Sequence, residues 1–480
     1  MTLGFFSLQV AHSENEQLAM TTDANIGLAI EYRLAQDHRV QENLIEVVVE
    51  RGIVTFTGRV DNLLSKERAS ALAETIKGVR SVINRIIVAP STQLDDENIQ
   101  HHVQSALLEN PATELYEIDV TVQDGSVHLQ GTVQSWQEKQ LALQVAKGVN
   151  GIKTLTHDIM IKTIDDRSDH AIREEIIQRL TYDVWVNPES LDVVVQDGTV
   201  SLSGTVNSLD QKSRAIHLSW VHGITAVHGD QLNVEWSPSQ RLRRTGLVTP
   251  SDETIQQAIK DALSYDPRVV KSDITIEVNE GLVILTGTVD TLYAKQAIEE
   301  DAQNTVGIYR VVNHVKVQSQ TTIPDEEIAS RMQASISRDP FLDQENIDVT
   351  VHHGTVFLQG HVTSRYQQAR ATTLAWGVKG VVNVSNTLQH PVKWTWESDI
   401  ELRQNIKEQF WWSPFLSVES ITVQVEDGVA TLDGTVDSWQ QRHIAKDNAL
   451  AAGAKSVHNR IQIQSLDGSS FVPTPEKLYR

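Results

Sequence analysis

The sequence predicts an α+β fold of six tandem αββαβ units, each a small three-stranded mixed sheet with two helices on one face. Three observations support this: a recurring glycine pair, alternating apolar residues around it, and a helical period on either side. The second glycine follows the first by six positions in Gly52/Gly58, Gly125/Gly131, Gly198/Gly204, Gly281/Gly287, Gly354/Gly360 and Gly428/Gly434. The first glycines lie 73, 73, 83, 73 and 74 residues apart, so a unit of about seventy residues repeats along the chain.

Each unit opens with a segment of helical period. In the fourth unit, apolar residues stand at Ile255, Ala258, Ile259, Ala262 and Leu263. A spacing of three and four residues places these side chains on one face of a helix. We therefore expect an amphipathic helix at the start of every unit.

Two strands joined by a tight turn follow the opening helix. The second unit has Ile118, Val120 and Val122 before its first glycine, and the pattern Val-x-Leu-x-Gly after it. Alternation of this kind is typical of half-buried strands. The pair Asp124-Gly125 tolerates the positive φ angles of a two-residue hairpin turn, so the two strands are expected to be antiparallel.

A second helix and a third strand close each unit. Eleven and fifteen positions after the second glycine stand mostly small residues, such as Ala142 and Ala146, which let a helix lie close to a sheet. Another glycine near the helix end, Gly151 in the second unit, suits a helix C-terminus. Because the third strand is reached through a helix, we expect it to run parallel to a strand of the hairpin.

The chain therefore divides into six units and one insertion, at residues 236–250, which separates two half-arrays of three units. A duplicated three-unit ancestor is the economical explanation. The expected bounds are 22–90 for unit 1, 94–163 for unit 2, 167–236 for unit 3, 237–250 for a linker, 251–319 for unit 4, 324–392 for unit 5 and 397–465 for unit 6.

This order of elements resembles the BON domain, named for bacterial osmotically inducible and nodulation proteins. The resemblance rests on the Asp-Gly turn, the Val-x-Leu-x-Gly-x-Val strand, the alanine-bearing helix and a Gly-Val-x-x-Val close such as Gly78-Val79-Arg80-Ser81-Val82. It covers roughly residues 22 to 465. It implies a bacterial module associated with osmotic or envelope stress that contacts phospholipid or partner proteins, and it carries over no catalytic residues.

Composition argues against several functions. The net charge of -22, from 63 acidic and 41 basic residues, disfavours nucleic acid, whose binding needs a basic face. The chain has no cysteine, and no phosphate-binding loop, nucleophile motif or regular metal-ligand spacing is present. We therefore expect no enzyme activity, no cofactor and no metal site, the histidine pairs His101-His102 and His352-His353 included.

The sequence favours a cytoplasmic location, with the periplasm as the alternative. No stretch approaches the ~18 apolar residues of a membrane span. The apolar opening at residues 1–10 lacks a basic region and is soon followed by Glu14 and Glu16, which makes it a poor secretory signal. Met20 is a possible true start. The family resemblance points toward the periplasm instead.

Two groups of residues are candidates for lipid or partner contact. Arg241, Arg243 and Arg244 form a dense basic run in the insertion, which as a linker is otherwise a solvated hinge. An aromatic cluster near the start of the last unit includes Trp411, Trp412 and Phe415. These rings either pack between units or form an apolar patch that marks an interface.

Two functions are compatible with these features. The first is a non-catalytic, multivalent binding scaffold that contacts a phospholipid surface or an envelope protein through several weak contacts. The second is an osmotic-stress sensor whose units bind a small ion such as potassium, as some BON proteins do. Carbonyl-lined ion sites leave no residue-type signature, so the sequence leaves both open.

Overall fold

The computed structural model describes residues 21–37, 39–40, 44–91, 93–162, 167–236, 250–269, 273–318, 323–391 and 398–464. Arg241, Arg243 and Arg244 lie outside these ranges. Within them the chain forms twelve α-helices and six small mixed sheets, one sheet in each unit. This confirms the α+β fold expected from the glycine repeat.

The elements recur in the same order in each unit. Units 1 and 2 contain α2 (Asp23–Gln36), β1 (Ile45–Glu50), β2 (Ile53–Val60), α3 (Leu63–Glu74), β3 (Ser81–Asn84) and β4 (Ile87–Val88), then α4 (Asp96–Glu109), β5 (Glu117–Gln123), β6 (Ser126–Val133), α5 (Trp136–Lys147) and β7 (Thr154–Ile161). Units 3 and 4 contain α6 (Asp169–Tyr182), β8 (Leu191–Gln196), β9 (Thr199–Val206), α7 (Leu209–Leu218) and β10 (Ala226–Val234), then α8 (Asp252–Tyr265), β11 (Asp273–Asn279), β12 (Leu282–Val289), α9 (Leu292–Gln303), β13 (Arg310–Asn313) and β14 (Lys316–Val317). Units 5 and 6 contain α10 (Asp325–Arg338), β15 (Asn346–His352), β16 (Thr355–His361), α11 (Arg365–Trp376) and β17 (Asn383–Asn386), then α12 (Asp399–Trp412), β18 (Ile421–Glu426), β19 (Val429–Val436), α13 (Trp439–Ala451), β20 (Ser456–Asn459) and β21 (Gln462–Ile463).

Each sheet has the predicted mixed topology. In unit 2, β5 and β6 are antiparallel, with Val120 opposite Leu129. The strand β7 runs parallel to β6, with Leu155 opposite Val127. The hairpin turn has φ of 52° at Asp124 and 75° at Gly125, the left-handed conformation that a tight hairpin needs.

The glycine that ends each hairpin is required by close approach of the neighbouring strand. At Gly131, a Cβ would lie 2.2 Å from the carbonyl oxygen of Glu117. At Gly287 it would lie 2.0 Å from the oxygen of Asp273. No residue other than glycine fits these positions without moving the backbone.

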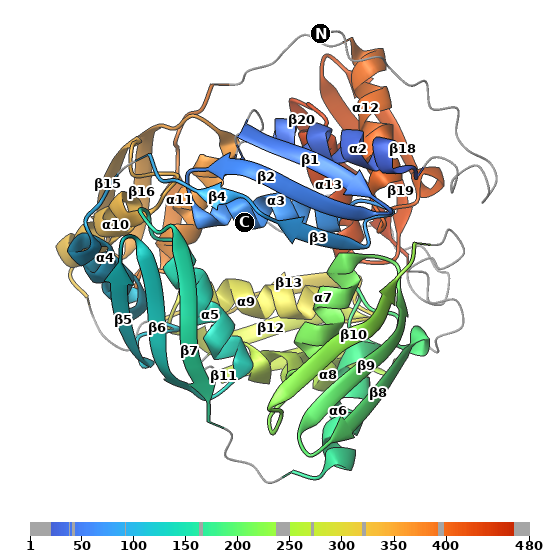
Figure 1. The fold of residues 1–480 in the computed structure, drawn as a ribbon, viewed down its shortest axis with the longest axis horizontal. Helices are drawn as coiled ribbons and strands as arrows, with labels where there is room; N and C mark the ends of the chain where they lie inside the picture. The colour runs from blue at the N-terminus through green and yellow to red at the C-terminus, as the bar shows by residue number, and fades with distance from the viewer. Residues whose placement is uncertain are drawn as a thin grey trace.

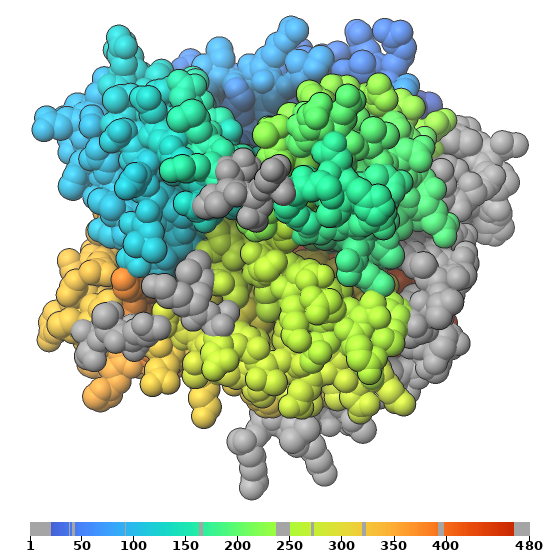
Figure 2. Space-filling model, turned by 90° about the horizontal axis from the view of Figure 1, so that it is seen from below, coloured from blue at the N-terminus to red at the C-terminus, as the bar shows by residue number. Residues whose placement is uncertain are grey.

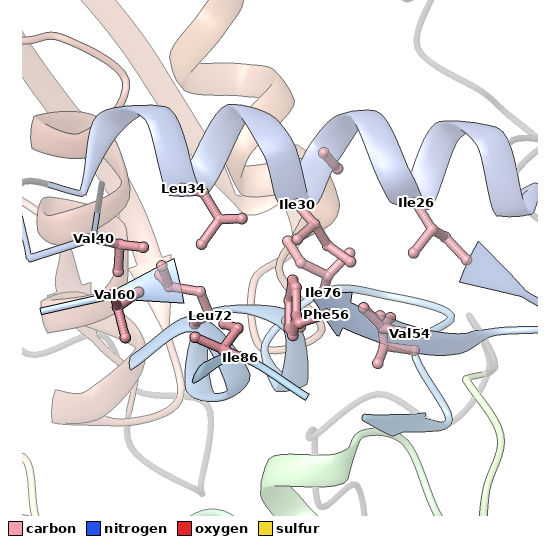
Figure 3. Packing of buried hydrophobic residues seen from close by; sticks show 14 of the residues in the cluster. Ile26, Ile30, Leu34, Val40, Val54, Phe56, Val60, Leu72, Ile76 and Ile86 are labelled. Atoms are coloured by element: carbon pink, nitrogen blue, oxygen red, sulfur yellow. The ribbon is translucent and has the colours of Figure 1, made fainter. Parts of the chain in front are cut away.

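Both helices of a unit pack on one face of its sheet. In unit 1, Ile26, Ile30 and Leu34 of α2 face Val54 and Phe56 of β2 across a buried core (Figure 3). The small residues of the second helix are fully buried in all six units: Ala69/Ala73, Ala142/Ala146, Ala215/Ser219, Ile298/Ala302, Ala371/Ala375 and Ala445/Ala449 are each 0 % exposed. Their size sets the short distance between helix and sheet.

The six units close into one body with helices toward the middle and sheets outward. Figure 1 shows α5, α7 and α9 near the centre, with β5–β7 and β8–β10 on the outside. Figure 2 shows units 1 to 3, blue to green, on one side of the molecule, and units 4 and 5, yellow to orange, on the other. The two half-arrays therefore lie against each other as two layers.

The same backbone contact joins the two layers in three pairs of units: 1 with 6, 2 with 5, and 3 with 4. In each pair the end of an opening helix meets the loop after a second helix. The backbone bonds run from Lys77 N to Trp412 O (3.0 Å), Asn150 N to Arg338 O (2.8 Å) and Val306 N to Tyr182 O (2.9 Å). The same contact made three times matches a duplicated three-unit array.

Candidate binding surface

The acidic residue that begins each opening helix has a structural role. Both carboxylate oxygens of Asp96 accept backbone N–H bonds from the hairpin turn, from Asp124 and Gly125, each at 2.8 Å. At Asp325, the bonds from His353 and Gly354 lower the pKa of the carboxyl group. Asp23, Asp169 and Asp399 bind their own turns in the same way, and Asp252 accepts one such bond, from the backbone N–H of Glu280. Their fixed distance before each first glycine is the sequence signal that could have revealed this role.

The structure places the predicted aromatic residues between units, with Trp412 half-buried. Trp411 and Phe415 are buried, with 7 % and 4 % exposure. Phe415 packs edge-on against Trp185 of unit 3 at 4.9 Å, and Trp412 packs against the core of unit 1. Trp411, Trp412 and Phe415 therefore follow the first of the two alternatives for these rings, packing between units 1, 3 and 6.

A different apolar surface is exposed on the sheet of unit 1. We call it the unit 1 outer face. Its apolar side chains are Leu44, Val48, Ile53, Ile83 and Ile87, which are 49 %, 45 %, 36 %, 40 % and 63 % exposed. In the strand register, Val48 and Ile83 stand on either side of Thr55, and Ile87 pairs with Arg59. These apolar residues share the outward face of the sheet, and the pair Glu46 and Thr57 stands between the Val48–Ile83 row and Ile87.

Exposed arginines surround this patch. Arg51 lies in the hairpin turn, Arg80 precedes β3, Arg85 separates β3 from β4, and Arg59 lies on β2 beside Ile87. Two acidic side chains, Glu46 and Glu50, are exposed on β1. None of the four arginines forms a salt bridge with a described residue. The face is locally basic on a strongly acidic chain.

The corresponding row is polar in units 2 and 6, whereas units 3, 4 and 5 each keep one or two apolar residues in it: Val194 in unit 3, Ile284 and Val312 in unit 4, and Phe357 in unit 5. Where unit 1 has the row Val48, Thr55 and Ile83, unit 2 has Thr121, His128 and Thr156, and unit 6 has Gln424, Thr431 and His458. Fold requirements therefore do not explain the apolar residues of unit 1. Several exposed apolar residues grouped on one face with a basic rim suit an interaction surface.

The described residues give little support to a metal site or a membrane-spanning helix. They contain no cluster of three or more His, Asp or Glu side chains that could hold a metal ion. In the described ranges, no helix is both long and apolar enough to cross a bilayer. His353 lies in a hairpin turn with φ of 50°, and His352 is exposed on the preceding strand.

These features define the chain as an array of small α+β modules, closed on itself, with one apolar and basic outer face. The family model for the BON domain matches residues 22–90, 95–163, 168–235, 251–319, 324–390 and 398–465. The chain belongs to the BON domain family, as the sequence pattern indicated.

Similar proteins come from bacteria. The "Osmotically-inducible protein Y" of Escherichia coli is 27 % identical over 199 residues, which cover 40 % of this chain and 95 % of that protein. The "Outer membrane lipoprotein DolP" of Haemophilus influenzae is 24 % identical over 155 residues, 31 % of this chain and 80 % of that protein. A solved structure of CdsD, a structural protein of the type III secretion system of Chlamydia trachomatis, is 17 % identical and covers 44 % of this chain and 93 % of that one, with a TM-score of 0.13. The expectation of a cytoplasmic location gains no support from these relatives.

Proposed function

We propose that this chain is a non-catalytic multi-BON scaffold of the bacterial cell envelope that docks on anionic phospholipid surfaces through the unit 1 outer face. The observation that carries the proposal is the combination of Ile53, Ile83 and Ile87 with four exposed arginines on one sheet. The envelope location is supported by a relative named as an outer membrane lipoprotein.

A bilayer suits this face better than a pocket ligand does. The patch follows the surface of a sheet, so it meets an extended partner. Isoleucine side chains enter the boundary between headgroups and acyl chains, while arginines meet anionic headgroups at the rim. Each basic residue near such a membrane contributes about 1 kcal/mol. The strong negative charge of the rest of the chain repels the same surface, which orients the protein with unit 1 toward the lipid.

Vesicle co-sedimentation tests the proposal. Phosphatidylcholine vesicles with and without phosphatidylglycerol are compared at low salt. The double variant Arg59→Gln/Arg85→Gln is expected to bind the anionic vesicles about thirtyfold more weakly, from a loss of about 2 kcal/mol. Ile83→Gln/Ile87→Gln is expected to weaken binding at both low and high salt, because the apolar contribution is not screened.

Matched control variants remove exposed basic or apolar side chains from other units. Lys316→Gln/Lys455→Gln deletes two exposed charges in units 4 and 6, and Met160→Gln and Val194→Gln delete exposed apolar residues in units 2 and 3. These variants are expected to bind like the wild type. Absence of vesicle binding by the wild type, or an equal loss in the controls, contradicts the proposal and favours an envelope protein as the partner.

Two further measurements test the linker arginines and the ion-binding hypothesis. If Arg241, Arg243 and Arg244 also meet lipid, replacing all three with Gln weakens binding by roughly two orders of magnitude, from about 3 kcal/mol. Thermal shifts that depend on potassium, without vesicle binding, favour the sensor function instead.

A further inference from the structure

A cavity of about 430 Å³ lies where units 2, 3 and 4 meet. Its walls come from α5 of unit 2, α6 and α7 of unit 3, and α8 and α9 of unit 4. Figure 1 shows α5, α7 and α9 near the middle of the molecule. A cavity of this size accommodates a small organic molecule. It shares no residue with the unit 1 outer face, so a ligand bound there is independent of the proposed membrane docking.

The wall of the cavity is polar and carries more acidic than basic side chains. It includes three arginines and five carboxylates. The amide side chains of the wall are Gln137, Gln140, Gln144, Gln178 and Asn304. His217 also lines the cavity, and burial together with two nearby arginines lowers its pKa to about 3, so it is neutral at physiological pH.

The arginines of the wall already have partners. Arg214 binds Asp183 at 2.6 Å, and Arg268 binds Asp266 and Glu300 at 2.6 and 2.8 Å. Arg179 donates to the carbonyl oxygens of Leu218 and Trp220 and lies over the ring of Tyr265. None of them is left to attract an anion, so the excess charge of the wall is negative.

Asp301 of α9 forms no salt bridge with a described residue, although Arg214 and Arg268 are close enough to act on its charge. Its Oδ2 is shielded from water and accepts no hydrogen bond from a described residue. Burial, with Asp266 and Glu300 nearby, raises the pKa of this group well above its usual range, although Arg268 and Arg214 act in the opposite direction. Ionisation of Asp301 is therefore costly, and the group favours its neutral form unless a further cation joins it.

The repeat shows that the scaffold does not require this acid. At the same place in the second helix, units 1, 2, 3 and 5 have Leu72, Val145, Leu218 and Leu374, and unit 6 has Asn448. The apolar residue that suits the fold is replaced by an acid only in unit 4. A residue that differs in this way from its equivalents in the other units, and that lowers stability, indicates a function.

We propose that this cavity binds a small organic cation with several N–H donors, of the linear polyamine class, through Asp301. A bare metal ion is less suitable, because the described residues lack a ligand cluster for one. A linear amine matches the cavity in size, its ammonium group supplies the charge that Asp301 lacks, and the amide oxygens of the wall accept its remaining N–H groups. Tyr182 and Tyr293 also line the cavity.

Isothermal titration calorimetry of the full chain with putrescine, and with 1,4-butanediol as a neutral probe of the same length, tests this proposal. Putrescine is expected to bind at one site and the diol not to bind. Asp301→Asn, which keeps the shape of the side chain, is expected to weaken putrescine binding at least tenfold. Asp273→Asn removes an equal charge from the exposed end of β11 and is expected to change nothing.

A second variant separates binding from folding. Asp301→Leu installs the residue of units 1, 3 and 5, so we expect it to abolish putrescine binding and to raise the thermal unfolding midpoint. The proposal is overturned if the wild type does not bind putrescine, if the diol binds equally well, or if Asp301→Asn and Asp273→Asn bind putrescine with the same affinity as the wild type.

Discussion

Substitution of Gly287 by alanine measures how strictly the repeat glycine is required. Gly287 has φ of 123°, and an added Cβ would lie 2.0 Å from the carbonyl oxygen of Asp273 and 3.1 Å from the Cα of Ile274. The backbone conformation alone costs about 1–3 kcal/mol for a residue with a Cβ. The two strands must also separate by more than about 1 Å, which weakens neighbouring ladder bonds worth about 0.5–1.5 kcal/mol each. We expect a total loss of about 3–5 kcal/mol in the stability of unit 4.

Amide hydrogen exchange followed by mass spectrometry locates this loss. Peptides from β11 and β12 are expected to exchange much faster in Gly287→Ala, because the free energy of local opening falls. Gly377→Ala is the matched control: its φ is ordinary and the nearest atom to its Cβ, the oxygen of Leu374, is 3.4 Å away. If protection of β11 and β12 is the same in Gly287→Ala as in the wild type, the close-approach argument is wrong.

Two further predictions concern contacts between units. Residues 251–320 alone are expected to unfold at a lower temperature than a fragment of three units. A seventy-residue domain buries only about 60 % of its unfolded surface, and Val306 loses its backbone bond to Tyr182 of unit 3. An equal or higher unfolding midpoint for the single unit refutes this prediction. Lys77 is buried beneath the rings of Trp236 and Trp411, and burial lowers its pKa from 10.5 to about 7. Between pH 7 and pH 10.5 the unfolded chain binds more protons at Lys77 than the folded chain does, so the free energy of unfolding rises with pH across this window. In urea titrations, Lys77→Met is expected to show a smaller rise of the unfolding free energy with pH. The same rise as in the wild type speaks against a lowered pKa of Lys77.

Much of the fold was predictable because each unit repeats the same local rules. The Asp124-Gly125 turn, the parallel third strand and the small residues Ala142 and Ala146 were all confirmed. These features depend on short stretches of chain. A period of two or 3.6 residues and the steric needs of glycine are enough to specify them.

The binding surfaces were not predictable in the same way, because they depend on how units pack together. The sequence left open whether Trp411 and Phe415 pack between units or form an exposed patch, and the pairing of units buries them. Conversely, Ile83 and Ile87 fit an ordinary strand pattern, and only the outward direction of that strand face shows that they meet solvent. One signal was available: both Ile83 and Asp301 differ in polarity from most of their equivalents in other units.

The most direct test of the proposed function is a fluorescence measurement at a single position of the unit 1 outer face. Since the chain has no cysteine, Ser81→Cys carries one environment-sensitive dye on the exposed end of β3, and Ser456→Cys carries it at the matching place on β20 of unit 6. With anionic vesicles, we predict a blue shift and stronger emission from the dye at position 81 and no change at position 456. An equal response at both positions, or none at position 81 while the protein co-sediments with the vesicles, would contradict docking through the unit 1 outer face.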